Sequence, residues 1–304
     1  MLTIALTWQQ AGTVSAGLFG AAVAATAVTK AGRLPSRASR RLTVAAAFAR
    51  EAGILFGLYA LWQLSGYVAK ASPSGAVQRG EWIWHFERVV GLPNEAALQR
   101  AFLPHPLLVQ ALNFYYDLLH FPVLLGCLVW LFAWHRDWYR PVRTTVALFT
   151  AASLLVALIS VAPPRLLPGV GMTDTALAYG QSVYGQHVVA DPNQLSAMPS
   201  VHVGWALLVA VAIISAARSR WRWLALAYPA LTTLAVVVTA NHYWLDGIVA
   251  GALLALVIAA QRAIRLLGRA LQRRALARRG AAAAPAHVPA KAAAATDDED
   301  AAAA

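Results

Sequence analysis

The chain has 304 residues, of which 59% are hydrophobic and 12% charged, and its mean hydropathy is +0.56. A soluble domain carries about twice that share of charged residues, so the composition excludes an ordinary soluble protein and predicts an all-α, polytopic membrane bundle. The net charge of +12 could suggest a nucleic-acid partner, but the basic residues gather in alternate connections between apolar runs, and we expect no nucleic-acid partner.

Seven apolar runs are long enough to cross a bilayer as helices, and they cover residues 11–29, 44–69, 107–134, 144–162, 200–217, 221–240 and 244–261. The connections rich in arginine and lysine are 30–41, 135–143, 218–222 and the segment after the last run. The positive-inside rule assigns these connections to the cytoplasm. Residues 70–106, residues 163–199 and the turn at Asn241 therefore face the opposite side.

Arg50 and Glu51 interrupt the second run. Adjacent residues do not face each other on a helix, so we expect each to have a partner on another helix or a place near the membrane boundary. In the next connection, residues 81–88 mix aromatic and charged side chains, a pattern typical of a helix that lies in the membrane interface. Its tryptophans fit an anchoring role or a role in lipid entry.

The third run contains a polar stripe at its outer end. Tyr116 and His120 are four residues apart and share one helical face, which Asn113 can join. Such a stripe usually faces the interior of a bundle. Two interpretations stay open: structural hydrogen bonds, or contact of Tyr116 and His120 with a substrate. The run also holds the single cysteine, Cys127, which excludes an intramolecular disulfide and a cysteine-cluster metal site.

Pro163 and Pro164 end the fourth run, and Arg165 follows in the loop. An arginine in the sparsely basic outer half has a planar fork that suits a phosphate group. Arg165 is therefore a candidate phosphate ligand, and the alternative is binding of lipid headgroups without chemistry. Asp174 and Asp191 in the same loop could bind a headgroup or remain solvated.

The fifth run follows Pro199 and Ser200, which makes Ser200 a candidate N-cap. A helix start forms an anion site from its free amides and dipole, so Ser200 is also a candidate phosphate ligand. His202 would lie in the first turn beside the anion, where a histidine suits a general acid that protonates a departing oxygen. A histidine at this position without catalytic work is the alternative.

Only Asn241–Tyr243 separates the sixth and seventh runs, so we predict a tight hairpin with His242 at its tip. Asp246 lies four residues later on the same face, where its carboxylate can hold the imidazole. A neutral imidazole held in this way can attack phosphorus directly; the alternative is a hydrogen-bonded histidine that caps the hairpin. No metal-ligand spacing accompanies these histidines, and we expect neither a metal ion nor another cofactor.

These motifs resemble the type 2 phosphatidic acid phosphatase superfamily. Its second signature, Pro-Ser-x-His, is matched by residues 199–202, and its third signature ends in His-x-x-x-Asp, which matches His242 and Asp246. The resemblance implies that His242 is the nucleophile, that Asp246 is its partner, and that His202 is the acid for the leaving alkoxide and later the base for the acceptor.

The resemblance also implies a six-helix core at about 44–261, here preceded by an extra N-terminal helix. We accordingly expect three parts: 1–43 as a transmembrane helix and basic cytoplasmic loop, 44–265 as a six-helix catalytic membrane domain, and 266–304 as a basic, then alanine-rich, disordered cytoplasmic tail. Arginine far outnumbers lysine, which favours a bacterial source and hence the inner (cytoplasmic) membrane.

Within the superfamily, the chain is most similar to the inositol phosphorylceramide synthase branch, which is inositolphosphotransferase-like. Pro-Pro-Arg-Leu-Leu-Pro at 163–168, Gly-x-x-Asp at 171–174, Met-Pro-Ser-x-His at 198–202 and His-Tyr-x-x-Asp at 242–246 are in the style of that branch.

Two cations of the common superfamily signatures are missing. The serine and arginine that stand seven and six residues before the third-signature histidine are Ala235 and Val236 here, and the lysine seven residues before the first-signature arginine is Leu158. Arg165, the helix start and His120 would then have to neutralise the phosphate.

Residues and resemblance together predict a metal-independent phosphatase or phosphotransferase acting on a lipid phosphate through a phosphohistidine, with its active site outside the cytoplasm. The partners would be a lipid phosphate or phospholipid and the bilayer. One alternative is transfer of inositol phosphate or another headgroup to make a phospholipid or sphingolipid. The other is non-catalytic binding or transport of a lipid phosphate.

Overall fold

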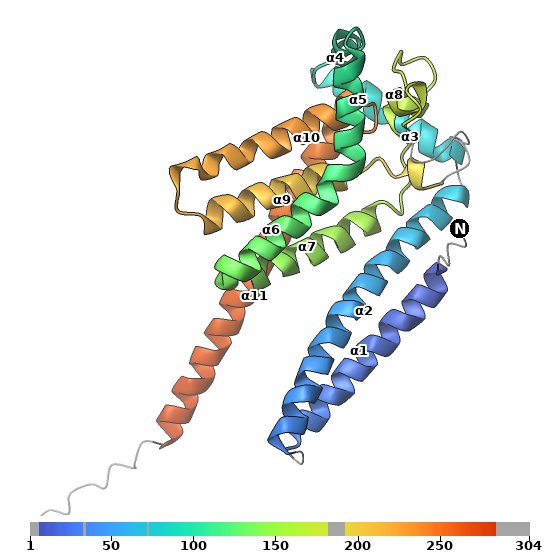
Figure 1. The fold of residues 1–304 in the computed structure, drawn as a ribbon. Coiled ribbons are helices and arrows are strands. Elements are labelled where there is room, and N and C mark those ends of the chain that lie inside the picture. The colour runs from blue at the N-terminus through green and yellow to red at the C-terminus, as the bar shows by residue number, and fades with distance from the viewer. Residues whose placement is uncertain (1–5, 33–34, 72, 182–191, 284–304) are drawn as a thin grey trace, which may run out of the picture. The chain divides into compact units, whose positions relative to one another are not determined.

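The computed structural model describes residues 6–32, 35–71, 73–181 and 192–283, and the described chain is helical apart from short connections (Figure 1). The helices are α1 (Trp8–Lys30), α2 (Ser36–Ala71), α3 (Pro73–Val89), α4 (Glu95–Phe102), α5 (Pro106–Phe114), α6 (His120–Trp134), α7 (Arg136–Val156), α8 (Thr175–Ala178), α9 (Val201–Ala216), α10 (Ala227–Val238) and α11 (Trp244–Ala283). Between them lie the π turn η1 (Tyr115–Leu119) and the 3₁₀ turns η2 (Pro164–Leu166), η3 (Pro192–Leu195) and η4 (Arg220–Leu226).

Five of the described helical stretches are long and apolar enough to cross a membrane: Trp8–Lys30, Ser36–Tyr67, Pro106–Trp134, Arg220–Val238 and Trp244–Arg274. The prediction of an all-α, multi-pass membrane protein is thus confirmed. Two predicted runs differ from a full span. α7 begins at Arg136, before the run at 144–162, and ends at Val156, while α9 has only 16 residues.

The C-terminal end of the fourth run leaves the helix because its backbone bonds to other segments. The N–H of Val161 donates to the carbonyl of Leu195 (2.7 Å), and the N–H of Ala197 donates to the carbonyl of Val161 (3.1 Å). The N–H of Ala162 donates to the carbonyl of Ala76 at the start of α3 (3.0 Å). Because of these bonds, residues 161–162 form an extended connection instead of a last helical turn, and this connection contacts the loop before α9.

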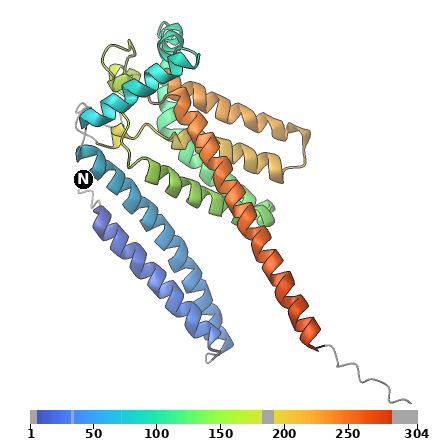
Figure 2. The same ribbon diagram turned by 180° about the vertical axis from the view of Figure 1, so that it is seen from behind.

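The first two helices lie side by side in both views (Figures 1 and 2). The Ser15 hydroxyl donates to the carbonyl of Gly53 across them (2.7 Å). Glu51 of α2 accepts a hydrogen bond from Arg143 of α7, and Arg50 lies 3.4 Å from the same carboxylate. The expectation that the charges inside the second run need a partner on another helix is confirmed for Glu51.

The chain divides into two units, Met1–Ile258 and Ala259–Ala304, and α11 begins in the first and continues into the second. Its helical structure extends past residue 261, where the last apolar run ends, to Ala283. The alanine-rich end of the predicted tail, 284–304, lies outside the described residues. All candidate site residues belong to the first unit.

Apolar side chains from α6, α7, α9 and α11 form the largest core cluster, which includes Leu131, Phe149, Val209 and Leu254. Gly204 on α9 lies directly against this cluster, because a Cβ atom at that position would be 1.9 Å from Cζ of Phe149. The missing side chain therefore lets α9 approach α7 closely, two residues after the candidate acid His202.

We expect Gly204→Ala to lower the thermal unfolding temperature of the purified protein in detergent. The added methyl group overlaps a ring that is itself fully buried, and overpacking of this kind costs roughly 1–3 kcal/mol. Gly126→Ala on α6 is the matched control, since nothing lies within 4 Å of its Cβ position. Equal unfolding temperatures for the two variants would contradict the close packing of α9 on α7.

Candidate active site

The turn between α10 and α11 fixes the backbone of His242. The N–H groups of Ala240 and Asn241 donate to the carbonyls of Val237 and Val236 (2.9 and 3.0 Å), which are the two bonds of a Schellman motif. Ala240 has φ 57°, a left-handed conformation that costs an alanine about 1 kcal/mol or more. The N–H of His242 donates to the same Val236 carbonyl (3.2 Å). Strained turns of this kind are found preferentially at functional sites.

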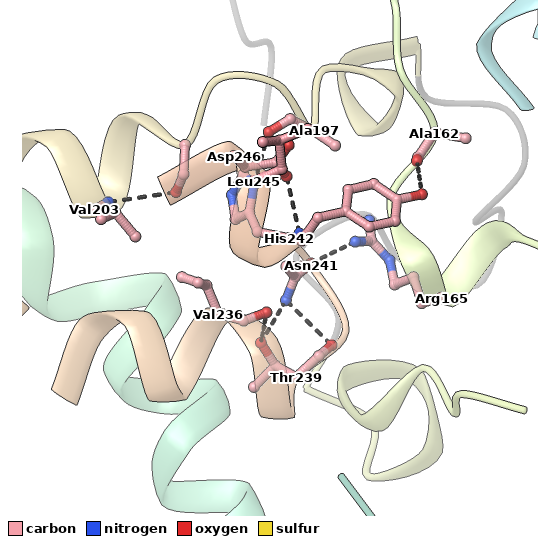
Figure 3. Close-up of polar contacts among 12 residues, drawn as sticks. Ala162, Arg165, Ala197, Val203, Val236, Thr239, Asn241, His242, Leu245 and Asp246 are labelled. Carbon is pink, nitrogen blue, oxygen red and sulfur yellow. Dashed lines mark hydrogen bonds and ion pairs between the residues drawn. The ribbon is translucent and has the colours of Figure 1, made fainter. Parts of the chain in front are cut away.

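Among the described residues, the hydrogen-bond partners of the His242 imidazole lie at Nδ1. Its Nδ1 lies 2.7 Å from the carbonyl oxygen of Ala197 and 3.1 Å from Oδ2 of Asp246 (Figure 3). Both partners are acceptors, so Nδ1 carries the proton and Nε2 presents a lone pair. The described structure thus brings together the pair predicted from the spacing and adds a backbone carbonyl that sequence reasoning did not find.

Asp246 is fully buried and has a second partner. Its Oδ2 accepts the N–H of Tyr243 (3.0 Å), so the carboxylate also caps the start of α11. The hydroxyl of Tyr243 donates to the carbonyl of Ala162 (2.7 Å), which ties the hairpin to the connection after α7 (Figure 3). The carboxylate orientation is therefore set by the helix start rather than by His242 alone.

Ser200 caps α9 as predicted. Its hydroxyl oxygen accepts the N–H of Val203 (3.3 Å), and its own N–H donates to the carbonyl of Asp246 (3.3 Å). These bonds place the start of α9 beside the start of α11. The ring of His202 lies 5.8 Å from the ring of His242, measured between centroids, and its Nδ1 is buried without a hydrogen-bond partner among the described residues.

Arg165 lies on η2 beside the hairpin tip, with its side chain 5% exposed. Its guanidinium donates to Oδ1 of Asn241 (Figure 3) and to Oε1 of Gln194 (3.1 Å), and its Nε lies 3.1 Å from Oδ2 of Asp174. Its backbone N–H donates to the carbonyl of Ala240 (3.1 Å). Arg165 is thus bound to the residue that precedes His242.

Tyr116, in the π turn η1, and His120, which directly follows it, lie close to His202 and His242. The Tyr116 ring lies 4.4 Å from the His202 ring and 6.3 Å from the His242 ring, and the His120 ring lies 4.8 Å from that of His202. Nδ1 of His120 bonds to the carbonyl of Tyr116 (3.1 Å), so Nε2 is its acceptor atom, and it is buried without a partner among the described residues. π turns occur often at functional sites.

Two polar residues, Asp174 and Asn113, have partners that the sequence did not indicate. Asp174 is 14% exposed and pairs with Arg165, and it caps α8 through the N–H of Leu177 (2.9 Å), so it is not simply solvated. Asn113 does not join the Tyr116 face, because its amide bonds to Thr175 (2.8 Å) and Gln181 (2.9 Å). Asp191 lies outside the described residues.

Sequence reasoning missed two polar partners of Arg165. Asn241 and Gln194 are buried amides in connections, and only the position of Asn241 next to His242 could have indicated its role. Where the common third signature carries serine and arginine, Ala235 and Val236 are instead 0% and 1% exposed and belong to apolar clusters. Across the described ranges, no group of three or more histidine, cysteine or acidic side chains could hold a metal ion.

Comparison with protein-family models matches residues 81–261 to the PAP2 superfamily. No curated protein and no solved structure matches the chain significantly. The matched segment contains the candidate residues of α5–α6, the Arg165 loop, the start of α9 and the hairpin, and it covers more than half of the 304 residues. The chain therefore belongs to the PAP2 superfamily.

Proposed function

We propose that this protein is an integral-membrane phosphatase or phosphotransferase of lipid phosphates that forms a phosphohistidine at His242. Membership of the PAP2 superfamily implies activity of this general type. One observation carries the specific proposal: both partners of His242 Nδ1, the Ala197 carbonyl and the Asp246 carboxylate, are acceptors. Nε2 is thereby left as the nucleophilic atom.

In the first half-reaction, Nε2 of His242 forms a bond to phosphorus, and the bond from phosphorus to the lipid oxygen breaks. His202 gives a proton to that oxygen, so the alcohol leaves neutral. The two rings lie 5.8 Å apart between centroids, and the proposal places the phosphoryl group between their nitrogens. The cationic phosphoimidazole is stabilised by Asp246 through the Nδ1 proton.

In the second half-reaction, the deprotonated His202 takes a proton from the acceptor. The acceptor oxygen forms a bond to phosphorus, and the bond from phosphorus to Nε2 breaks, which returns His242 to its starting state. The reaction is a hydrolysis when the acceptor is water and a transfer when it is an alcohol. The same intermediate serves both.

Phosphate charge is balanced at the start of α9 and by Arg165. A helix start offers its first N–H groups to an anion, and Ser200 contributes by capping that start, since its hydroxyl is bonded to Val203. Asp174 orients the Arg165 guanidinium. In this proposal the start of α9 and Arg165 replace the cations that are absent at Leu158 and Val236.

The proposal includes the finer topology. Six helices of residues 44–265 form the catalytic membrane domain. Two of them, α7 and the short α9, fall outside the five long apolar stretches. Residues 1–43 add one transmembrane helix, and residues 266–304 form a tail. Because the arginine-rich connections are cytoplasmic under the positive-inside rule, the site faces outside the cytoplasm, in the inner membrane of a bacterium.

Transfer to an alcohol, as in the inositolphosphotransferase-like branch, is the second candidate. The observation that favours it is His120, whose Nε2 is a buried acceptor next to the His202 ring. An acceptor there can orient a hydroxyl of an incoming alcohol, and the Tyr116 ring provides an apolar wall beside it.

The test is a screen of lipid phosphates, isoprenoid diphosphates and phosphoinositides with the purified protein, in which released phosphate and lipid products are both measured, with and without inositol as acceptor. Phosphate release without an acceptor supports the phosphatase, and a new phospholipid formed only with the acceptor supports the transferase. Lipid phosphate binding without either product would leave the non-catalytic alternative and overturn the proposal.

We expect His202→Ala to damage turnover most for substrates with poor leaving groups. A general acid contributes about 10²- to 10⁴-fold, and an alkyl phosphate needs that proton whereas an aryl phosphate with an acidic phenol does not. The measurement compares kcat on a lipid phosphate and on a nitrophenyl phosphate for wild type and variant. Equal losses on both substrates would argue against the acid role of His202.

A further inference from the structure

Helices α3 and α4, with the turn between them (residues 73–102), form a bracket that is bonded to both arms of the catalytic hairpin. Leu245 N–H donates to Oε1 of Glu87 (2.6 Å), and the Trp244 indole N–H donates to the carbonyl of Pro93 (2.8 Å). The amide of Gln99 donates to the carbonyl of Val238 at the end of α10 (2.8 Å). The bracket therefore reaches the chain on either side of His242.

α3 also packs closely against the hairpin. A Cβ atom at Gly80 would lie 2.7 Å from the Ala162 carbonyl oxygen and 2.8 Å from the Tyr243 hydroxyl. The apolar face of α3, including Ile83, belongs to the same cluster as Tyr243. Segment 81–88 therefore does not lie wholly on a surface. Trp82 is exposed, but the charged residue Glu87 is fully buried.

The bracket contains two buried carboxyl groups and one guanidinium. Glu87 and Glu95 are both 0% exposed, and Arg88 Nη2 lies 2.6 Å from Oε2 of Glu95 and 3.7 Å from Oε2 of Glu87. The Arg88 side chain also donates to the carbonyl of Pro93 (3.0 Å). One partly exposed guanidinium thus serves two fully buried carboxyl groups.

The two acids have matching unsatisfied atoms. Oε2 of Glu87 and Oε1 of Glu95 have no hydrogen-bond partner among the described residues, and both are acceptors while ionised. Both carboxyl groups lie against the same Arg88 Nη2 atom, and an interaction with Glu95 contributes to the raised pKa of Glu87. A single proton between them would satisfy both atoms and remove one of two like charges.

Charged and titratable groups face Glu87 from each element packed against it: Arg88 on its own helix, Glu95 on α4, Asp246 on α11 and Tyr243 in the hairpin. The pKa of Glu87 is raised to about 9, mainly by burial and then by the hydrogen bond and the charge of Glu95, while the Leu245 N–H opposes the shift. A protonated carboxyl at neutral pH is consistent with the geometry.

We propose that Glu87 and Glu95 share one proton and act as positioning residues, which hold the first turn of α11 and with it Asp246 and His242. Loss of that proton places a second negative charge against Glu95 and Asp246, which loosens the bracket from the helix start. The kinetic readout of this inference rests on the proposed function. The inference assigns no contact between either glutamate and the substrate.

The test is Glu87→Gln. The glutamine oxygen can accept the Leu245 N–H and its amide can donate to Glu95, so both bonds remain while the titratable proton is removed. Wild-type kcat is expected to fall above about pH 9. The variant is expected to stay within about threefold of the wild-type kcat at pH 7 and to lose that alkaline decrease. Glu81→Gln on the same helix is the control and should keep the wild-type profile.

Glu87→Ala removes the bonds as well as the proton. We expect a kcat that is roughly 10- to 100-fold lower, since small misplacements of catalytic groups have effects of that size, with KM within about twofold. A Glu87→Gln variant that keeps the wild-type alkaline decrease overturns the shared proton. A Glu87→Gln variant that is inactive at every pH also overturns it, because glutamine preserves the bonds.

Thermal unfolding in detergent separates this inference from the proposed function, because it needs no substrate. The folded pKa of Glu87 is above its unfolded value near 4.5, so the folded state binds more protons between the two values and stability falls as pH rises toward about 9. The difference in unfolding temperature between the wild type and Glu87→Gln should therefore change to the disadvantage of the wild type as the pH rises from near 4.5 to about 9. Above about pH 9 this difference should stay constant. Parallel curves of unfolding temperature against pH for the two proteins would overturn the shared proton, even if the protein turned over lipid phosphates.

Discussion

Turnover is expected to disappear when His242 is replaced by alanine. The variant lacks the atom that bonds to phosphorus, and no other described side chain has the same pair of acceptors at its Nδ1. We expect phosphate release to fall by at least about 10⁴-fold, or about 5.5 kcal/mol of transition-state stabilisation. The measurement is single-turnover phosphate release by the purified protein on the lipid phosphate that gives the highest activity.

The accompanying control is His85→Ala, which removes an exposed histidine on α3 and should leave turnover unchanged. Incubation with radiolabelled substrate followed by rapid quenching should give an acid-labile, base-stable protein phosphate in wild type and none in His242→Ala. Undiminished turnover in the variant, or an equally labelled variant protein, would eliminate His242 as the nucleophile.

The fold could be predicted from the sequence where it depends on local pattern. The hairpin around His242 followed from two apolar runs separated by three residues, and Ser200 followed from its place before an apolar helix. The π turn at Tyr115–Leu119 could not be predicted, because a regular helix and a π turn have the same residue pattern there. The end of α7 also could not, since Val161 leaves the helix to bond with Leu195, far along the chain.

The candidate site divides in the same way. The contact between His242 and Asp246 is local, four residues apart, and the sequence predicted it. The Ala197 carbonyl reaches His242 from 45 residues away, and a backbone acceptor has no sequence signature. The mixture of aromatic and charged residues at 81–88 predicts an interfacial helix around Glu87. Only the packing of α3 on Tyr243 shows that the Glu87 carboxyl is buried.

Apolar packing accounts for the absence of an arginine at position 236. Val236 packs with Val203 and Tyr116, so an arginine at that position would need the apolar cluster between α9 and α10 to open. In the proposed mechanism, more of the phosphate charge is therefore balanced by Arg165 and the start of α9. This distribution is the physical reason to expect a substrate preference that differs from that of members with all the common cations.

Asp246→Asn is expected to reduce turnover by about 10²- to 10³-fold, less than His242→Ala. The asparagine oxygen can still accept the Tyr243 N–H, so the cap of α11 survives. The Ala197 carbonyl also still accepts the Nδ1 proton of His242, so the tautomer is kept. What is lost is the negative charge that stabilises the cationic phosphoimidazole, and breaking a buried charge pair costs about 3–5 kcal/mol. The measurement is kcat on the same lipid phosphate.

Asp246→Ala reports which partner governs the tautomer, because it removes the oxygen that contacts both Nδ1 and the Tyr243 N–H. If Asp246 alone held the Nδ1 proton, this variant would let the proton move to Nε2, and turnover would fall as far as in His242→Ala. Residual turnover well above that of His242→Ala therefore supports the second acceptor at Ala197. Because a backbone carbonyl cannot be removed by substitution, the comparison of Asp246→Asn with Asp246→Ala is the direct way to separate the charge of Asp246 from its role in orienting the ring.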